Sequence, residues 1–177
     1  MRQQTTPHIL MVRPSCFGFN EETAANNAFQ RKDEALSPAE VSRQALAEFD
    51  LFVKKLRTAG VSVIVAQDTP NPPKTDAVFP NNWITFHQEG FIVTYPMFSA
   101  IRRRERRRKV IDTVLSRGFL SKTRLNFEFN EKLSRFLEGT GSIVFDHQHR
   151  LAYACASPRT DVELLEELCQ KLGYRPI

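Results

Sequence analysis

The sequence predicts an α/β domain assembled from repeated strand-strand-helix units. Residues 83–95 alternate between apolar and polar side chains around a Gln-Glu-Gly turn, which is typical of a β-hairpin, and a helix is expected to follow over 102–117. A second hairpin pattern, around a polar turn, covers 142–155 and precedes a helix that Gly173 closes. The two units share a pattern rather than a visible sequence repeat.

The first part of the chain predicts a strand, a helix and a second strand. The apolar runs 8–12 and 61–66 are typical of buried strands. Ser37 is expected to cap the intervening helix, because proline follows it and Glu40 can reach back to the cap. Gly60 then ends that helix.

The remaining segments are expected to be loops, with one further helix start and one further strand. Residues 16–31 predict a loop with a short helix, and the proline-rich stretch 68–80 predicts a long loop. Residues 160–163 (Thr-Asp-Val-Glu) have the pattern of a capping box. A glycine followed by apolar residues begins the strand at 61–66, so the similar ending Leu-Gly-Tyr-Arg-Pro-Ile predicts a strand that starts near Ile177. We therefore expect residues 1–177 to be an incomplete single domain.

Composition narrows the class of protein. The chain has 177 residues, of which 41% are hydrophobic and 25% charged, as in ordinary globular proteins. It contains neither an apolar run of the roughly 18 residues that span a bilayer nor the apolar core of a signal peptide. Three scattered cysteines favour neither a disulfide framework nor a zinc site. We expect a cytoplasmic protein without metal or cofactor and without a membrane partner.

The net charge of +5 raises the alternative of nucleic-acid binding. Much of the excess lies in the run 102–109, which contains six arginines and one lysine. The simplest interpretation is the exposed face of a helix whose buried side is supplied by Val110, Ile111, Val114 and Leu115. Because no nucleic-acid motif accompanies the run, we expect no nucleic-acid partner.

Three short stretches place polar groups beside turns at strand ends, where binding sites commonly lie. They are DAVFPNNWITFH at 76–87, LEGTGS at 137–142 and ASPRT at 156–160. With MVRP at 11–14 and the YPM and RRRER segments near 100, these stretches resemble the citrulline-utilisation hydrolases of the guanidino-group-modifying, amidinotransferase-like superfamily. Arginine deiminases, arginine dihydrolases and dimethylarginine dimethylaminohydrolases are more distant relatives. The resemblance covers nearly the whole chain.

The resemblance implies a five-bladed α/β propeller (pentein-like), of which this chain holds the N-terminal blades and which is truncated at the C-terminus. It also implies hydrolysis of citrulline or arginine to ornithine and ammonia, through attack by a cysteine thiolate and proton transfer by a histidine. In such relatives both residues come later than residue 177, so we expect this chain alone to be inactive.

The resemblance assigns site roles to five residues. Glu138 matches the carboxylate that grips the guanidine nitrogens and orients the catalytic histidine, whereas Arg159 and Arg102 match arginines that hold the substrate carboxylate. Asn82 stands where arginine deiminases have aspartate, and an amide can also hold a neutral ureido group. Asp76 is a weaker candidate for substrate binding.

Without the resemblance, these residues have ordinary structural explanations. Asn82 would be a turn amide, Glu138 a solvated loop charge, Arg159 a surface cation and Asp76 a loop cap. Cys155 lies among apolar strand residues, so we expect it to pack in the core rather than to act as a nucleophile.

Two alternatives to an enzyme follow. The chain could be an inactive module that binds a guanidino or ureido amino acid or pairs with a partner chain, or it could be a basic nucleic-acid binder. An incomplete propeller would expose apolar surface, so we expect the isolated chain to be marginally stable or to associate with copies of itself.

Overall fold

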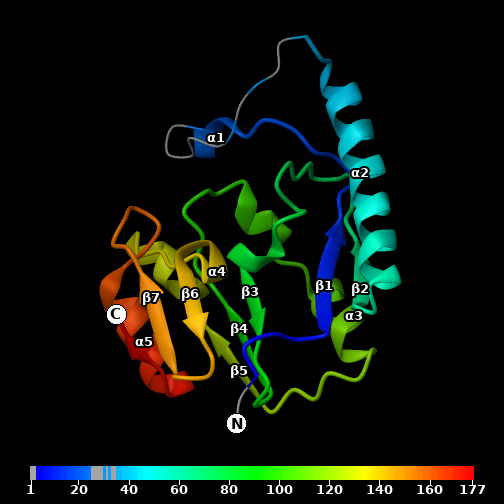
Figure 1. Ribbon diagram of the computed structural model, residues 1–177. Helices are drawn as coiled ribbons and strands as arrows, with labels where there is room; N and C mark the ends of the chain where they lie inside the picture. Colours follow the sequence, from blue (N-terminus) through cyan, green and yellow to red (C-terminus); the bar gives the residue numbers. More distant parts are fainter. Residues whose placement is uncertain (1–2, 25–29, 31, 33–34) are drawn as a thin grey trace. The chain divides into compact units, whose positions relative to one another are not determined.

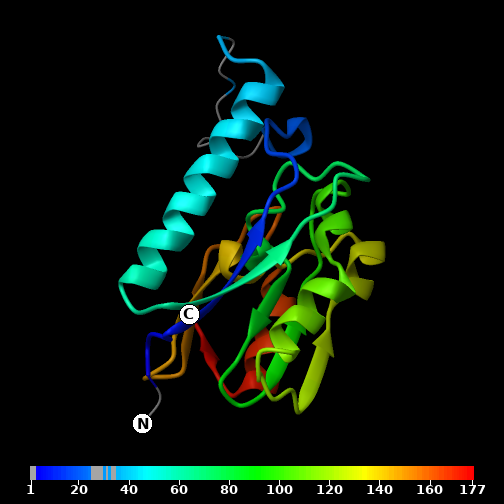
Figure 2. The ribbon, with the colours of Figure 1, turned by 90° about the vertical axis from the view of Figure 1, so that its right-hand side faces the viewer.

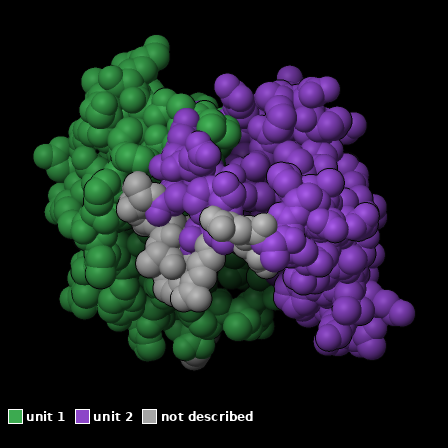
Figure 3. All heavy atoms as spheres, turned by 90° about the horizontal axis from the view of Figure 1, so that it is seen from above, with its two compact units in different colours: residues 1–6, 81–103, 119–177 green, residues 7–80, 104–118 purple. Residues whose placement is uncertain are grey.

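The computed structural model describes residues 3–24, 30, 32 and 35–177 and shows a mixed α/β fold with three small sheets (Figure 1). The chain divides into two compact units, coloured separately in Figure 3. Unit 1 comprises residues 1–6, 81–103 and 119–177, and unit 2 comprises residues 7–80 and 104–118. No helix in the described ranges is long and apolar enough to cross a membrane.

Unit 2 is built on two parallel strands, β1 (His8–Arg13) and β2 (Ser62–Gln67), which α2 (Pro38–Thr58) connects. Their register pairs His8 with Ser62 and Arg13 with Gln67. In Figures 1 and 2, α2 runs along one face of this pair. The short helix α1 (Glu21–Ala24) lies within the loop expected over 16–31, of which residues 25–29 and 31 are outside the described residues.

The predicted start of α2 is confirmed. Ser37 Oγ accepts the N–H of Glu40 at 3.3 Å, and Glu40 Oε2 accepts the N–H of Ser37 at 2.9 Å, so each residue satisfies a donor that the first turn leaves open. The apolar face of α2 buries Phe49 and Val53 against Val63 of β2. This small core holds the helix on the two strands.

Unit 1 contains two three-stranded sheets of identical topology, in which an antiparallel first pair is followed by a parallel third strand. Their strands are β3 (Ile84–Phe86), β4 (Phe91–Thr94) and β5 (Thr123–Asn126), and β6 (Ile143–Asp146), β7 (Leu151–Ala154) and β8 (Arg175–Pro176). Both predicted hairpins are confirmed, as is the strand near Ile177. The strand β5 was not predicted.

Short helical segments and α5 complete unit 1. They are η1 (Pro80–Asn82, whose first residue belongs to unit 2), η2 (Arg102–Glu105, whose last two residues belong to unit 2), η3 (Glu128–Leu133), α4 (Gly139–Ser142) and α5 (Val162–Leu172). The apolar face of α5 buries Leu164, Leu165 and Leu168 in the main core, as its spacing predicts.

The prediction for the N-terminus of α5 was wrong in one respect. Asp161, not Thr160, is the N-cap, and its carboxylate accepts the N–H of Leu164 at 2.9 Å. The carboxylate also receives two hydrogen bonds from Arg135, at 2.8 and 2.9 Å. Gly173 closes the helix in the left-handed conformation, with φ of 72°.

The prediction of a single helix over 102–117 was also wrong. Residues 102–105 form the 3₁₀ helix η2, and the regular helix α3 covers only Arg108–Leu115. Nor does the arginine run form one exposed face, because Arg102 and Glu105 are 4% and 3% exposed. The Arg103 side chain donates to two backbone carbonyls, those of Met97 and Phe98, at 2.9 and 3.3 Å. These hydrogen bonds to backbone carbonyl groups fix the Arg103 side chain in one position. A side chain on a solvated helix face would not be fixed in this way.

Candidate functional site

Glu138 is the centre of the candidate site. It lies immediately before α4 and is only 1% exposed. Its Oε1 atom accepts the backbone N–H of Phe98 at 3.0 Å, and its Oε2 atom accepts a hydrogen bond from Asn82 Nδ2 at 3.1 Å. A carboxylate buried to this degree is retained only when donors of this kind compensate for its lost hydration.

Arg159 reaches the same carboxylate from another part of the chain. Its Nη1 atom is 3.5 Å from Glu138 Oε2, and its guanidinium lies 5.9 Å from the centre of the Phe98 ring. The turn that carries Arg159 is anchored, because the Arg159 carbonyl accepts a hydrogen bond from Ser142 Oγ at 3.0 Å. Ser142 Oγ in turn accepts the N–H of Glu138 at 3.1 Å, which links the two site segments.

Glycines allow the segments to approach closely. Gly139 has a φ of +43°, and a Cβ atom there would lie 2.3 Å from the carbonyl oxygen of Asn81. A Cβ atom at Gly141 would lie 2.3 Å from Asn82 Nδ2. The glycine-rich stretch after Glu138 is therefore what permits the amide of Asn82 to sit against the carboxylate.

The cluster combines a buried anion, an amide and a cation. Asn82 is half-buried and uses its Nδ2 atom as a donor to Glu138, while its Oδ1 atom accepts no hydrogen bond from the described residues. An acceptor and a buried carboxylate side by side suit a planar group that carries several N–H donors. The Arg159 guanidinium is itself such a group.

The structure thus brings Asn82, Glu138 and Arg159 together. Arg102 belongs to the same unit, where it is buried and donates its backbone N–H to Ser99 Oγ at 3.3 Å. Asp76 belongs to unit 2, where its Oδ2 atom accepts a hydrogen bond from Asn20 at 2.5 Å.

Two partners of the predicted residues have no distinctive sequence signal of their own. The Phe98 donor is a backbone group, which any residue could supply. Asn20 is 3% exposed and lies in the stretch 17–23, which resembles the opening of the same superfamily but was assigned no site role.

A second polar network in unit 1 was not predicted. Thr85 Oγ1 lies 2.8 Å from both His87 Nε2 and the Tyr95 hydroxyl. Burial raises the pKa of Tyr95 above its usual value, so the phenol stays protonated. Strand alternation places a polar residue at 85, but it does not reveal that two further polar groups meet it.

The three cysteines lie in different surroundings and are all free thiols. Cys155 is exposed, so the prediction that it packs in the core was wrong: β7 buries Ala152 and exposes Tyr153, and Cys155 continues the outward parity just after the strand. Cys169 is buried, and burial raises the pKa of its thiol to about 11. Cys16 Sγ accepts the N–H of Lys74 at 3.3 Å. The described residues hold no cluster of three or more side chains suited to a metal ion.

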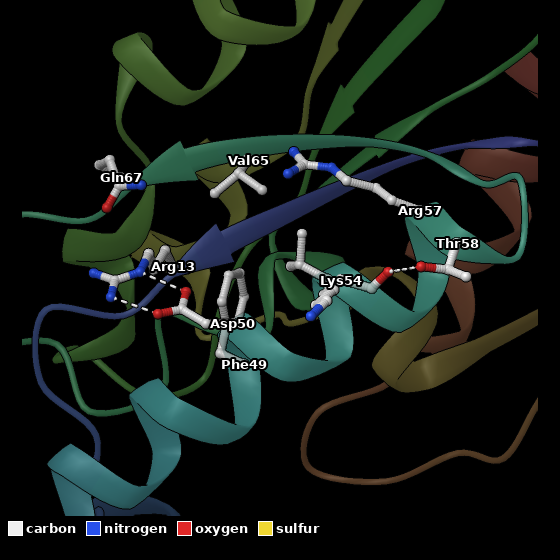
Figure 4. A pocket seen from close by; sticks show the side chains of 9 residues that line it. Arg13, Phe49, Asp50, Lys54, Arg57, Thr58, Val65 and Gln67 are labelled. Atoms are coloured by element: carbon white, nitrogen blue, oxygen red, sulfur yellow. Dashed lines mark hydrogen bonds and ion pairs between the residues drawn. The ribbon is translucent and has the colours of Figure 1, made fainter.

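A hollow with a volume of about 680 Å³ lies in unit 2, between α2 and the two strands (Figure 4). Arg13 and Asp50 point toward one another there and form two hydrogen bonds of 2.8 Å. Lys54 and Arg57 add further positive charge to its rim. None of the predicted site residues lines this hollow.

Comparison with known protein families shows to which family the chain belongs. Residues 13–177 match the model of the family described as N,N dimethylarginine dimethylhydrolase, eukaryotic. The chain belongs to this family. Its resemblance to the guanidino-group-modifying superfamily is thereby confirmed, through a branch that the sequence analysis placed among the more distant relatives. No curated protein matches the chain.

Solved structures of this superfamily share the fold. The N-terminal domain of ArgZ, a cyanobacterial arginine dihydrolase solved as a cysteine-to-serine mutant bound to substrate, matches with a TM-score of 0.67 at 16% identity, covering 96% of this chain and 56% of that one. The dimethylarginine dimethylaminohydrolase of Pseudomonas aeruginosa, complexed with citrulline, matches with a TM-score of 0.64 at 15% identity over 96% and 59%. The chain thus spans little more than half the length of these two structures.

Proposed function

We propose that this chain is the substrate-gripping part of a hydrolase that cleaves the C–N bonds in the guanidino or ureido group of an arginine-type amino acid, releasing ornithine, ammonia and, from the central carbon, carbon dioxide. The observation that carries the proposal is the buried Glu138 carboxylate, which accepts Asn82 Nδ2 at 3.1 Å and lies 3.5 Å from Arg159. Membership of the dimethylarginine hydrolase family and the similarity to ArgZ support the reaction class.

The site chemistry favours a planar ligand rich in N–H groups. Glu138 would accept N–H donors of the ligand, as the family resemblance implies. Asn82 offers an acceptor toward a ligand nitrogen and a donor toward a ureido carbonyl, which aspartate could not offer. Citrulline, or arginine through citrulline, is therefore our proposed substrate. The P. aeruginosa relative was solved with citrulline bound.

The arginines and Asp76 would serve the other end of the ligand. In our proposal Arg159 leaves Glu138 when a guanidino or ureido group arrives, and then holds the ligand's carboxylate together with Arg102. Arginine suits this role because its planar fork matches a carboxylate. Asp76 would contribute a further polar contact to the substrate.

The covalent step would follow the superfamily pattern. A cysteine thiolate would attack the central carbon of the planar group, and a histidine oriented by Glu138 would protonate the departing ammonia and then activate water. In this proposal both groups come from sequence outside residues 1–177, so the chain alone binds without turnover and needs no cofactor. The two sheets of identical topology in unit 1 support the further proposal that residues 1–177 are blades of one incomplete five-bladed propeller.

Calorimetric titration of the 177-residue chain with citrulline and arginine tests the proposal. We expect both to bind, and Glu138→Gln to weaken binding by roughly 10-fold or more, with the greater loss for cationic arginine, since a hydrogen bond to a charged group contributes about 1.5–3 kcal/mol. Glu166→Gln is the matched control, because Glu166 is exposed on α5. Unchanged affinity in Glu138→Gln would exclude this carboxylate from the site.

A further inference from the structure

Residues 97–98, in the loop between β4 and η2, are held by charged side chains. The N–H of Met97 donates to Glu131 Oε1 at 2.8 Å. The N–H of Phe98 donates to Glu138 Oε1 at 3.0 Å. Arg103 Nε donates to the carbonyl of Met97 at 2.9 Å, and Arg103 Nη2 donates to the carbonyl of Phe98 at 3.3 Å. Both N–H groups and both carbonyl groups of this segment therefore bind a charged group.

Arg103 and Glu131 also bind one another. Arg103 Nε lies 3.3 Å from Glu131 Oε2, and the two side chains are 30% and 11% exposed, so the ion pair is partly shielded from solvent. The guanidinium is planar, so its Nε and Nη2 atoms bind the two carbonyls with a fixed spacing. The Met97 carbonyl and the Phe98 N–H belong to one planar peptide group. The bond from Arg103 to that carbonyl therefore sets the direction of the Phe98 N–H.

The Phe98 N–H in turn determines how the Glu138 carboxylate is rotated. The last torsion of a glutamate side chain has broad minima, so the side chain alone does not fix the plane of its carboxylate. Because the Phe98 N–H holds Oε1, the Oε2 atom faces Asn82 Nδ2 at 3.1 Å and Arg159 Nη1 at 3.5 Å. The rotation of the carboxylate thus depends on a backbone group that Arg103 directs.

Aromatic contacts connect Arg103 to the Phe98 ring as well. This ring packs edge-on against Phe136, with ring centres 5.4 Å apart, and the Arg103 guanidinium lies 5.8 Å from the centre of the Phe136 ring. The Arg159 guanidinium lies 5.9 Å from the centre of the Phe98 ring. A shift of Arg103 would therefore also disturb the ring against which Arg159 lies.

We propose that Arg103, paired with Glu131, is a positioning residue for the ligand site. It directs the Phe98 N–H that orients Glu138, and it makes no contact with the ligand itself. This inference rests on the proposed function, because the ligand is the guanidino or ureido group that Glu138 would grip. Loss of Arg103 should weaken ligand binding although every group that contacts the ligand is still present.

Calorimetric titration and NMR spectroscopy of the 177-residue chain test the inference. We expect Arg103→Gln to bind citrulline roughly 3- to 10-fold more weakly, which corresponds to the loss of one ordinary hydrogen bond. Without ligand, its Phe98 amide resonance should move upfield, because the bond to Glu138 is weakened. Arg57→Gln is the matched control: Arg57 also donates to a backbone carbonyl, that of Val63 at 3.1 Å, but in unit 2. This control should change neither the citrulline affinity nor the Phe98 resonance.

Arg103→Lys is a second variant in case Arg103→Gln does not fold. Lysine keeps the positive charge beside Glu131 but lacks the planar fork that binds both carbonyls. It should therefore retain most of the free energy of unfolding and still show the Phe98 shift and the weaker binding.

Two outcomes would overturn the positioning role while the unmodified chain binds citrulline normally. One is an unchanged Phe98 resonance in the folded Arg103 variants, and the other is a shifted resonance with unchanged citrulline affinity. Failure of the unmodified chain to bind either citrulline or arginine would instead overturn the proposed function, and this inference with it.

Discussion

At the residue scale, the proposed function gives Asn82 the role of setting which ligand charge the site prefers. Its Nδ2 atom donates to Glu138 at 3.1 Å, so Asn82→Asp would place two carboxylates in contact. We expect the variant to lose about 1–3 kcal/mol of free energy of unfolding without ligand, because one hydrogen bond becomes a like-charge repulsion. We also expect it to bind arginine more tightly relative to citrulline, by roughly 10-fold, since a cation relieves the repulsion.

Chemical denaturation and calorimetric titration measure these two effects. Asn126→Asp is a suitable control, because it makes the same charge change at an exposed residue whose Oδ1 atom accepts the N–H of Glu128, and a carboxylate can accept it too. An unchanged ratio of arginine to citrulline affinity in Asn82→Asp would show that Asn82 does not select the ligand.

At this scale the sequence predicted the site residues whose side chains take part in the site, but not the backbone groups that bind them. Asn82, Glu138 and Arg159 were named from motifs, and they do meet. The N–H of Phe98 was beyond prediction because every residue has such a donor. Cys155 was assigned to the core from its apolar neighbours, but it is exposed. The side chains of β7 alternate between the two faces of the sheet, and Cys155 continues the outward-facing series. Which series faces outward is known only once the strand is placed in its sheet.

At the scale of the element, the N-terminus of α5 depends on Asp161. Hydrogen bonds from Arg135 hold the pKa of Asp161 below its usual value. A carboxylate with a lowered pKa in the folded state contributes stability above its unfolded pKa of about 3.9 and loses it as the pH falls through the lowered value. The stabilisation by Asp161 should therefore be present at neutral pH and disappear in acid.

Denaturation of two variants at a series of pH values separates the cap from the ion pair. Asp161→Asn keeps a capping side chain without the charge, so we expect its deficit relative to the unmodified chain to shrink below about pH 4. Asp161→Ala should lose about 1 kcal/mol more, because the N–H of Leu164 also loses its acceptor. A deficit of Asp161→Asn that does not vary with pH would contradict the role of the Arg135 pair.

Elements with strong local signals were predicted well. The capping box of α2 and the apolar–polar alternation of the two hairpins each depend only on residues close together in the sequence. The strand β5 has three exposed residues and only Leu125 half-buried, so its sequence carries no apolar alternation. The arginine run was misassigned because Arg103 binds carbonyls that the helical period cannot reveal.

At the scale of the whole molecule, the net charge of +5 is not evidence of a nucleic-acid surface. Arg102 is buried, Arg103 is paired with Glu131 at 3.3 Å, and Arg107 contacts Asp68 at 3.7 Å. We expect binding to a DNA duplex of about 20 base pairs to be weaker than about 100 µM at physiological salt, since fewer cations are available to displace counterions. Fluorescence anisotropy measures this, and submicromolar binding that falls steeply with salt would contradict it.

The architecture of the site also determines when it forms. The hydrogen bond between Asn82 and Glu138 joins residues 56 positions apart, and that between Phe98 and Glu138 joins residues 40 apart. We expect contacts so distant along the chain to form late in folding, after the intervening strands have paired, because closing a long loop costs conformational entropy. Citrulline, the proposed ligand, would then bind only to fully folded chains. Bound citrulline would slow the unfolding of these chains and leave their folding rate almost unchanged. The number of citrulline sites measured in a preparation would therefore equal the number of folded molecules in it.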